Sequence, residues 1–210
     1  MRTAASAVDH LVLATPDLVT TAAWIRESTG ITPATGGQHL GLGSRNMLCS
    51  LGDTSYLEII GPDPDQDPPP GRRPFGIDDL TEPDFVAWAI AVPDIEAAVA
   101  SARGAGYDAG AYRAMERRRP DGLVLRWQLT ASTSQTIPFL IDWGESPHPA
   151  RDAAPGLELH DLRARHPNPA TVALALEALG LTMAVDTGTE ALLPSLRGPR
   201  GSLDLTRLRA

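Results

Sequence analysis

Glu58 is the residue whose position most needs a chemical explanation. It is a carboxylate in the otherwise apolar stretch Tyr56–Ile60, a pattern that predicts a β-strand. An unpaired buried charge is expensive, so this carboxylate is expected to have a partner or a function. His10 lies in a second apolar strand, from Val8 to Ala14. Carboxylates and imidazoles accept protons and bind divalent metals, so proton transfer and metal binding are the two chemistries to consider.

Arg45 and Asn46 lie at the edge of the strand that precedes Glu58, just after Gly43 and Ser44. A guanidinium group binds a carboxylate in a bidentate manner, so this pair suits an anionic or carbonyl-bearing ligand. The alternative is that both residues serve the chemistry of a turn.

Five more arginines lie close together, at positions 113, 117, 118, 119 and 126. The sequence predicts a strand at residues 107–115, followed by a turn at residues 120–122. We interpret the arginines as the solvated surface of this hairpin, rather than as a site that binds phosphate or carboxylate. Arg126 is retained as a ligand-binding candidate. Trp127 and Trp143 are expected to form apolar walls of a pocket.

Other catalytic motifs are missing from the sequence. The glycine-rich stretch 36–43 lacks the Gly-Lys-Ser/Thr ending of a phosphate-binding loop, and no serine lies in a Gly-x-Ser-x-Gly turn. Cys49 lies within a predicted strand, where a thiol packs as a small apolar group. As the single cysteine of the chain, it also excludes an intrachain disulfide.

Composition narrows the classes of partner. The 210 residues carry a net charge of −8, and the sequence pI is about 5.0. Nucleic acids and anionic membranes require a basic protein surface, so neither is expected as a partner. No apolar run approaches the length of a membrane span, and a cytoplasmic location is therefore expected.

The elements that must position these residues recur three times. Each copy is an apolar strand, a proline followed by Asp or Asn, and an alanine-rich helix that ends at glycine. The prolines are Pro16, Pro93 and Pro167, separated by 77 and 74 residues, and the glycines Gly30, Gly106 and Gly180 follow them by 14, 13 and 13 residues. A period this long suits a duplicated α+β module rather than a solenoid.

The first two copies predict the same order of elements, β-α-β-β-β, over residues 7–61 and 85–144. The connector between them, residues 62–84, holds seven prolines and is expected to be stiff. The third copy, residues 157–210, predicts a partial β-α-β unit. Its apolar helix needs a surface on the first two units or on a partner chain. The sequence thus predicts an α+β protein, with 7–144 as one domain and 157–210 as a third partial module packed on it or on a partner chain.

Three short segments resemble a known superfamily: the opening Val8–Leu13, the cap Pro16-Asp17-Leu18 and the strand Tyr56–Ile60. They are similar to the vicinal oxygen chelate superfamily, which includes glyoxalases, extradiol dioxygenases and bleomycin-resistance proteins, and in particular to its uncharacterised glyoxalase-like domain branch. The resemblance covers residues 7–144 well. It implies that two paired βαβββ modules form a U-shaped mixed sheet around a cavity.

In that superfamily, residues of the first and fourth strands of the modules hold a divalent metal. The resemblance places His10 and Glu58 at those positions in the first module, and it implies zinc, nickel, manganese or iron as a cofactor. A substrate with adjacent oxygens would occupy the open coordination positions. The second module has Ala87 and Ile141 at the matching positions, unless a bulge turns Asp142 inward.

Three ways to complete this site stay open. His39, in the glycine-rich loop, would give a set of two histidines and one carboxylate together with His10 and Glu58. The third unit offers Asp161 and Asp204 instead. The last possibility involves no metal, and the ring of His10 then forms a hydrogen bond with Glu58.

The sequence and the resemblance together predict a protein that binds a small organic molecule in a cavity. The leading hypothesis is a metal-assisted lyase, isomerase or dioxygenase that acts on a vicinal-oxygen substrate, with Glu58 as metal ligand and general base. The alternative is a resistance-type protein that sequesters its ligand without chemistry. A homodimer is compatible with the apolar third unit.

Overall fold

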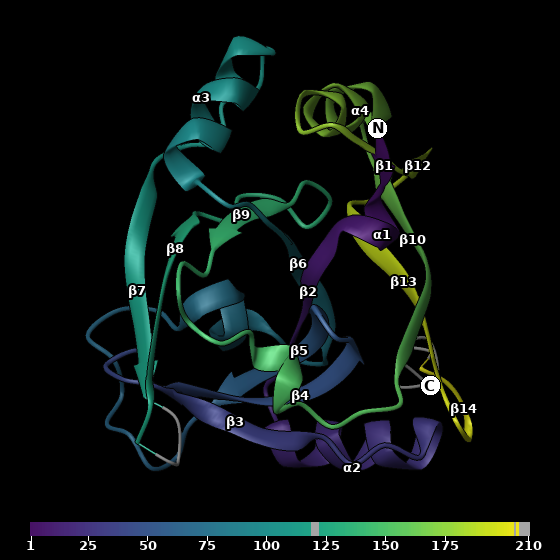
Figure 1. Ribbon diagram of the computed structural model, residues 1–210. Helices are drawn as coiled ribbons and strands as arrows, with labels where there is room; N and C mark the ends of the chain where they lie inside the picture. Colours follow the sequence, from purple (N-terminus) through teal and green to yellow (C-terminus); the bar gives the residue numbers. More distant parts are fainter. Residues whose placement is uncertain (119–121, 204, 206–210) are drawn as a thin grey trace.

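The computed structural model describes residues 1–118, 122–203 and 205, and its centre is a closed β-barrel (Figure 1). In these residues the strands follow one another around the barrel in the order β2-β5-β4-β3-β7-β8-β9-β6. Their bounds are Val8–Ala14 (β2), Ala34–His39 (β3), Ser44–Gly52 (β4), Ser55–Pro62 (β5), Asp84–Ala91 (β6), Tyr112–Arg118 (β7), Val124–Thr130 (β8) and Phe139–Asp142 (β9). The fold is the α+β class that the sequence predicts.

Each half of the barrel is one βαβββ module. In the first module, β2 is followed by α2 (Leu18–Thr29) and β3 to β5, and β2 pairs in parallel with β5. In the second, β6 is followed by α3 (Ile95–Gly104) and β7 to β9, and β6 pairs in parallel with β9. The modules join at β2 and β6, which are antiparallel over six residue pairs. At the other edge, β3 pairs with β7 through one described residue pair, Gln38 with Arg118. This pairing closes the expected U-shaped sheet into a barrel.

The helices begin and end where the sequence predicts. Asp17 Oδ1 accepts hydrogen bonds from the backbone N–H groups of Val19 and Thr20, each at 3.0 Å, and Gly30 ends α2 with a left-handed φ of 83°. Asp94 caps α3 in the same way. Such caps satisfy backbone groups that a helix end leaves unpaired. In the described part of the chain, no helix has the length and apolar character needed to cross a membrane.

Strand β7 lies further along the chain than the sequence predicts. The expected strand ran from residue 107 to 115, whereas the observed one is Tyr112–Arg118. Of the turn expected at residues 120–122, residues 120 and 121 lie outside the described residues. Because alternate residues of a strand face the same side, the observed register places Arg113, Met115 and Arg117 together on one face. This face lines the cavity described below, so the shift in register brings two arginines to the site.

The C-terminal part of the chain forms a second sheet, with the strand order β12-β10-β13-β14. The remaining elements are β1 (Arg2–Thr3), α1 (Ala4–Ala7), η1 (Pro74–Asp79), η2 (Pro149–Arg151), β10 (Glu158–His166), α4 (Pro169–Ala178), β11 (Leu181–Thr182), β12 (Ala184–Thr187), β13 (Ala191–Gly198) and β14 (Gly201–Leu203). Strands β1 and β11 pair in parallel, so the N-terminus of the chain is tied to this C-terminal part.

One hydrophobic core joins the second sheet to the barrel. Leu162 of β10 and Val172 and Leu176 of α4 belong to the same buried cluster as Leu11 and Trp88 of the barrel. Figure 1 shows the second sheet standing beside the barrel, with α2 below both. The division into a domain 7–144 and a module 157–210 stays a prediction. Both parts of the chain therefore contribute apolar side chains to one buried cluster.

Candidate functional site

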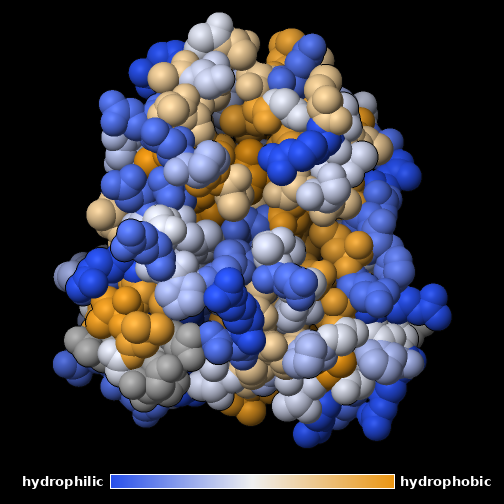
Figure 2. All heavy atoms as spheres, viewed as in Figure 1, coloured by the Kyte–Doolittle hydropathy of each residue, from blue (hydrophilic) through white to orange (hydrophobic). Residues whose placement is uncertain are grey.

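The barrel encloses a cavity of about 790 Å³, a volume usual for small-molecule sites. Figure 2 shows hydrophobic side chains in the hollow at the centre of one face, with hydrophilic ones around it. The polar groups deepest in this cavity are His10, His39, Asn46, Tyr56, Glu58 and Arg117, and the main apolar ones are Ile60, Phe75, Val86, Met115, Trp127, Leu129, Phe139, Ile141 and Trp143. The barrel therefore brings the histidine and the carboxylate of two separate apolar strands, His10 and Glu58, into one cavity.

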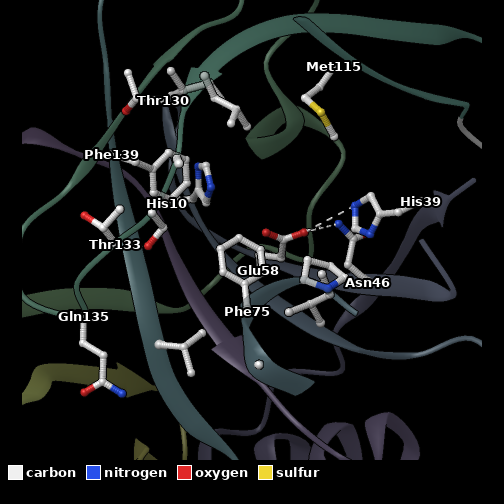
Figure 3. Close-up of a pocket in the computed structure, with 18 of the residues that line it drawn as sticks. His10, His39, Asn46, Glu58, Phe75, Met115, Thr130, Thr133, Gln135 and Phe139 are labelled. Atoms are coloured by element: carbon white, nitrogen blue, oxygen red, sulfur yellow. Dashed lines mark hydrogen bonds and ion pairs between the residues drawn. The ribbon is translucent and has the colours of Figure 1, made fainter. Parts of the chain in front are cut away.

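Glu58 is held by a short chain of hydrogen bonds on one side of the cavity (Figure 3). Its Oε1 accepts a hydrogen bond from Asn46 Nδ2 at 2.5 Å. Asn46 Oδ1 in turn accepts from Arg117 Nη1 at 2.8 Å and from the backbone N–H of Gly37 at 2.8 Å. The pairing of β4 with β5 places Leu48 opposite Glu58, so Asn46 is its diagonal neighbour on the same face. The buried carboxylate of Glu58 thus has a hydrogen-bond partner, the amide of Asn46.

His39 completes this side of the cavity. It lies at the end of β3 rather than in a free loop, and its Nε2 is 3.8 Å from Glu58 Oε1. Its Nδ1 is 3.1 Å from Ser44 Oγ. Burial lowers the pKa of His39, and the charge of Glu58 only partly opposes that shift. The ring is therefore favoured in its neutral form.

Asp9 supports His10 from behind. The ladder between β2 and β6 has an irregularity between Val8 and His10, and a bulge of this kind re-aims side chains. Asp9 Oδ1 lies 2.6 Å from His10 Nδ1, and Asp9 Oδ2 accepts from Trp143 Nε1 and His148 Nε2, each at 3.0 Å. Burial raises the pKa of Asp9, but the hydrogen bonds to the two histidines outweigh it and lower the pKa to about 2.

These contacts fix the tautomer of His10. An ionised carboxylate only accepts hydrogen bonds, so Nδ1 of the ring must carry the hydrogen that faces Asp9. The other ring nitrogen, Nε2, is then the proton acceptor of the neutral imidazole. The ring itself stacks on Tyr56, with centroids 4.8 Å apart, and meets Phe139 edge-on at 5.3 Å. Among the described residues no hydrogen bond joins His10 to Glu58, so the alternative in which they pair directly is not the one observed.

The other expected ligand-binding residues divide into two groups. Asn46, Trp127 and Trp143 line the cavity, and the two indole rings are 5.4 Å apart. Arg45 does not line it and instead lies 3.2 Å from a carboxylate oxygen of Asp65. Arg126 also lies outside, exposed, with its Nε 3.4 Å from Glu116 Oε2.

Arg117 is one of the cavity residues that sequence reasoning missed. It was expected in a solvated hairpin, whereas the structure buries it within the cavity wall with 6% of its surface exposed. The error follows from the misplaced strand, because the expected register ended at Met115. No local pattern distinguished Arg117 from a solvated arginine, because apolar and polar residues do not alternate over residues 112–118.

The residues present do not fit the divalent metal that the resemblance implies. Among the described residues, no three His, Cys, Asp or Glu side chains are grouped so that they could hold a metal ion. His10 directs Nδ1 to Asp9. Glu58 accepts a hydrogen bond from the amide of Asn46, which in turn accepts one from the guanidinium of Arg117. A fixed positive charge so close to the carboxylate opposes a second cation.

Among the described residues, the second module and the third unit supply no further metal ligand. Ile141 faces the cavity, and Asp142 faces away, accepting from the backbone N–H groups of Ile95 at 3.3 Å and Gly144 at 2.8 Å. Asp161 is exposed on β10. Asp204 lies outside the described residues.

Comparisons with known proteins agree with this fold. Residues 8–180 match the family described as a glyoxalase-like domain. A hypothetical protein from Staphylococcus aureus has a similar structure, with a TM-score of 0.64, 14% identity and coverage of 88% of this chain and 87% of that one. Methylmalonyl-CoA epimerase from Mycobacterium tuberculosis gives a TM-score of 0.46 at 17% identity, over 72% of this chain and 95% of that one. The epimerase from Streptomyces coelicolor gives 0.44 at 19% identity, over 67% and 96%.

At 14% identity the Staphylococcus aureus structure informs the fold alone, and the two epimerase structures, with TM-scores below 0.5, carry no argument. Among curated proteins, none matches this sequence. The family match, however, spans most of the chain and both βαβββ modules. The chain therefore belongs to the glyoxalase-like domain family, within the vicinal oxygen chelate superfamily.

Proposed function

We propose that this protein binds a small organic molecule inside the barrel and transfers a proton to or from it through His10. The observation that carries the proposal is the buried pair of Asp9 and His10, whose Oδ1 and Nδ1 atoms are 2.6 Å apart at the wall of the cavity. A carboxylate that holds one ring nitrogen fixes the tautomer and stabilises the imidazolium form once the other nitrogen accepts a proton.

Each neighbouring residue has a separate task in this proposal. His10 Nε2 is the general base, and Asp9 is a positioning residue that acts through it. Glu58, on the adjacent strand β5, is a second proton acceptor in the same cavity. The guanidinium of Arg117 and the ring of His39 supply hydrogen-bond donors for a ligand oxygen on which charge develops. Isomerase or lyase chemistry on a carbonyl compound with an acidic C–H bond suits these groups.

A second candidate is a binding protein without chemistry. The apolar walls of the cavity favour it, since Trp127, Trp143 and Phe139 offer a large surface to an aromatic or aliphatic ligand. The bond between Asn46 and Glu58 also favours it, because that carboxylate already has a partner.

Hydrogen–deuterium exchange distinguishes the two candidates even while the substrate is unidentified. The protein is incubated in D2O with a panel of 2-oxo acids, 2-hydroxyketones and aldehydes, and loss of C–H signals is followed by proton NMR. We expect exchange in at least one compound, unchanged by EDTA, abolished in His10→Gln and retained in His160→Gln. The control residue His160 is exposed on β10, beside Glu158.

Two results would contradict the proposal. Exchange that depends on added metal would restore the metal-assisted hypothesis. Tight binding of a panel member without any exchange would favour the binding protein instead.

A further inference from the structure

Two arginines line the cavity along one strand. Arg113, Met115 and Arg117 alternate on the inner face of β7, and all three line the cavity. Arg117 is buried beside Asn46, whereas Arg113 is exposed at the rim. We call Arg113 and Arg117 the β7 arginine pair.

Three acidic residues, Asp79, Asp84 and Glu190, also line the cavity, and each has a partner outside the β7 arginine pair. Asp79 forms an ion pair with Arg72. Asp84 accepts a hydrogen bond from Gln135 Nε2 at 3.2 Å. Glu190, which comes from the second sheet, accepts from the backbone N–H of Gln135 at 3.0 Å. Arg113 forms no ion pair with any residue of the described segments.

Apolar side chains lie directly beside the pair. Strand β8 runs antiparallel to β7, and its Leu129 is opposite Arg113 while its Trp127 is opposite Met115. Leu129 and Trp127 both line the cavity. One wall therefore combines two positive charges with an apolar surface, whereas the carboxylates of the lining, Glu58, Asp79, Asp84 and Glu190, come from other elements. Beside this wall, the charge and the apolar surface together suit an organic anion.

We propose that the ligand of this cavity is an organic anion, with a carboxylate, sulfonate or phosphate group bound by the β7 arginine pair and an apolar body against Trp127 and Leu129. This inference rests on the proposed function, since it assumes that the barrel cavity is the binding site. It adds the class of ligand, which the residues around His10 alone do not determine.

Two probes with one shared ring system test the charge preference. Anilinonaphthalene sulfonate is an organic anion, and N-phenylnaphthylamine is a similar aromatic amine without the sulfonate. Both are titrated into the full-length protein, with fluorescence as the readout and mutual displacement as the criterion for a shared site. We expect the anionic probe to bind about tenfold more tightly than the neutral one, as charge-assisted hydrogen bonds predict.

Substitution of Arg113 then tests whether the β7 arginine pair causes the preference for the anionic probe. In Arg113→Gln the preference for the anionic probe should fall about tenfold, while Arg113→Lys should keep part of it. Arg126→Gln is the matched control, because Arg126 is an exposed arginine on the paired strand that faces away from the cavity. It should change neither affinity by more than about twofold. Circular dichroism of each variant confirms that it is folded.

The outcomes separate this inference from the proposed function. Equal affinity of both probes, or an anionic preference that survives Arg113→Gln unchanged, overturns the inference and leaves the cavity proposal standing. Failure of the two probes to displace each other, together with an absence of hydrogen–deuterium exchange in the carbonyl panel, counts against the cavity itself.

Discussion

The two βαβββ modules share an order of elements but differ in what they contribute to the cavity. The first module supplies Asp9 and His10 from β2, Glu58 from β5 and the amide of Asn46 from β4. The second has Ile141 at the position that matches Glu58. Duplication of the module thus repeats the scaffold but not the same polar groups, and the second copy supplies Arg117 together with the apolar wall against which a ligand packs.

The largest effect should come from placing a charge in the second module. Ile141 is 1% exposed, and Ile141→Asp would bury a carboxylate without a built partner. We expect a loss of about 3 kcal/mol in the free energy of unfolding, measured by urea denaturation. Ile141→Val is the matched control, with a loss of about 1 kcal/mol. Equal stability of the aspartate variant and the parent would mean that this wall tolerates charge as the first module does.

Asp9→Asn should have the next largest effect. The substitution removes a buried charge that His10, Trp143 and His148 all contact. A loss of about 2 kcal/mol is expected in urea denaturation, because charged hydrogen bonds in a buried network are among the strong ones. Asp53→Asn, at an exposed turn, provides the control. If both variants unfold at the same urea concentration, Asp9 is not the support that we describe.

The pH dependence of unfolding offers an independent test of Asp9. Its pKa of about 2 in the folded protein lies below its ordinary value of 3.8. The unfolded chain therefore binds the proton first, so the contribution of Asp9 is complete above pH 3.8 and is lost as the pH falls toward 2. Urea midpoints measured across this range should decline more steeply in the parent than in Asp9→Asn. Parallel curves would refute the assignment.

Glu58→Gln should separate stability from chemistry in the first module. Glutamine keeps an oxygen that can accept the hydrogen bond from Asn46 Nδ2, so we expect a stability loss of no more than about 1 kcal/mol. Exchange of substrate protons, in contrast, should slow by about 100-fold if Glu58 is a proton acceptor. A variant that is much less stable but fully active would show that the carboxylate serves only the structure.

His39→Gln should have the smallest effect on stability, visible in the pH profile of unfolding. Burial lowers the pKa of His39, so the unfolded chain takes up the proton before the folded one does. The parent should lose stability as the pH falls below the ordinary pKa of histidine, about 6.5, and the variant should lack this component. The comparison is made between pH profiles of thermal unfolding, and identical profiles would contradict it.

Much of the fold was predictable because local signals agreed with the final structure. Asp17, Gly30 and Asp94 cap their helices where the sequence places them, and the threefold recurrence of proline and glycine identified the modules. Glu58 was also predictable, since a charge in an apolar strand is conspicuous on its own. These signals all depend on a few neighbouring residues.

The rest of the site depends on contacts that are distant in sequence. Asp9 reaches the back of His10 only because of a bulge, and its other partners come from residues more than 130 positions away. Arg117 is buried only because the barrel closes around β7. His148 lies in a segment that reads as a linker, with no local pattern to distinguish it. Such residues become visible only once tertiary structure is known.

The uneven joining of the modules has a consequence for how a ligand enters. Six residue pairs bind β2 to β6, whereas a single described pair binds β3 to β7. Since the hydrogen bonds of a short seam break at lower free energy than those of a long one, the barrel should part first between Gln38 and Arg118. The modules would then separate at β3 and β7 while remaining joined at β2 and β6. The width of the gap between β3 and β7, rather than that of the rim, would set the size of molecule that the protein admits.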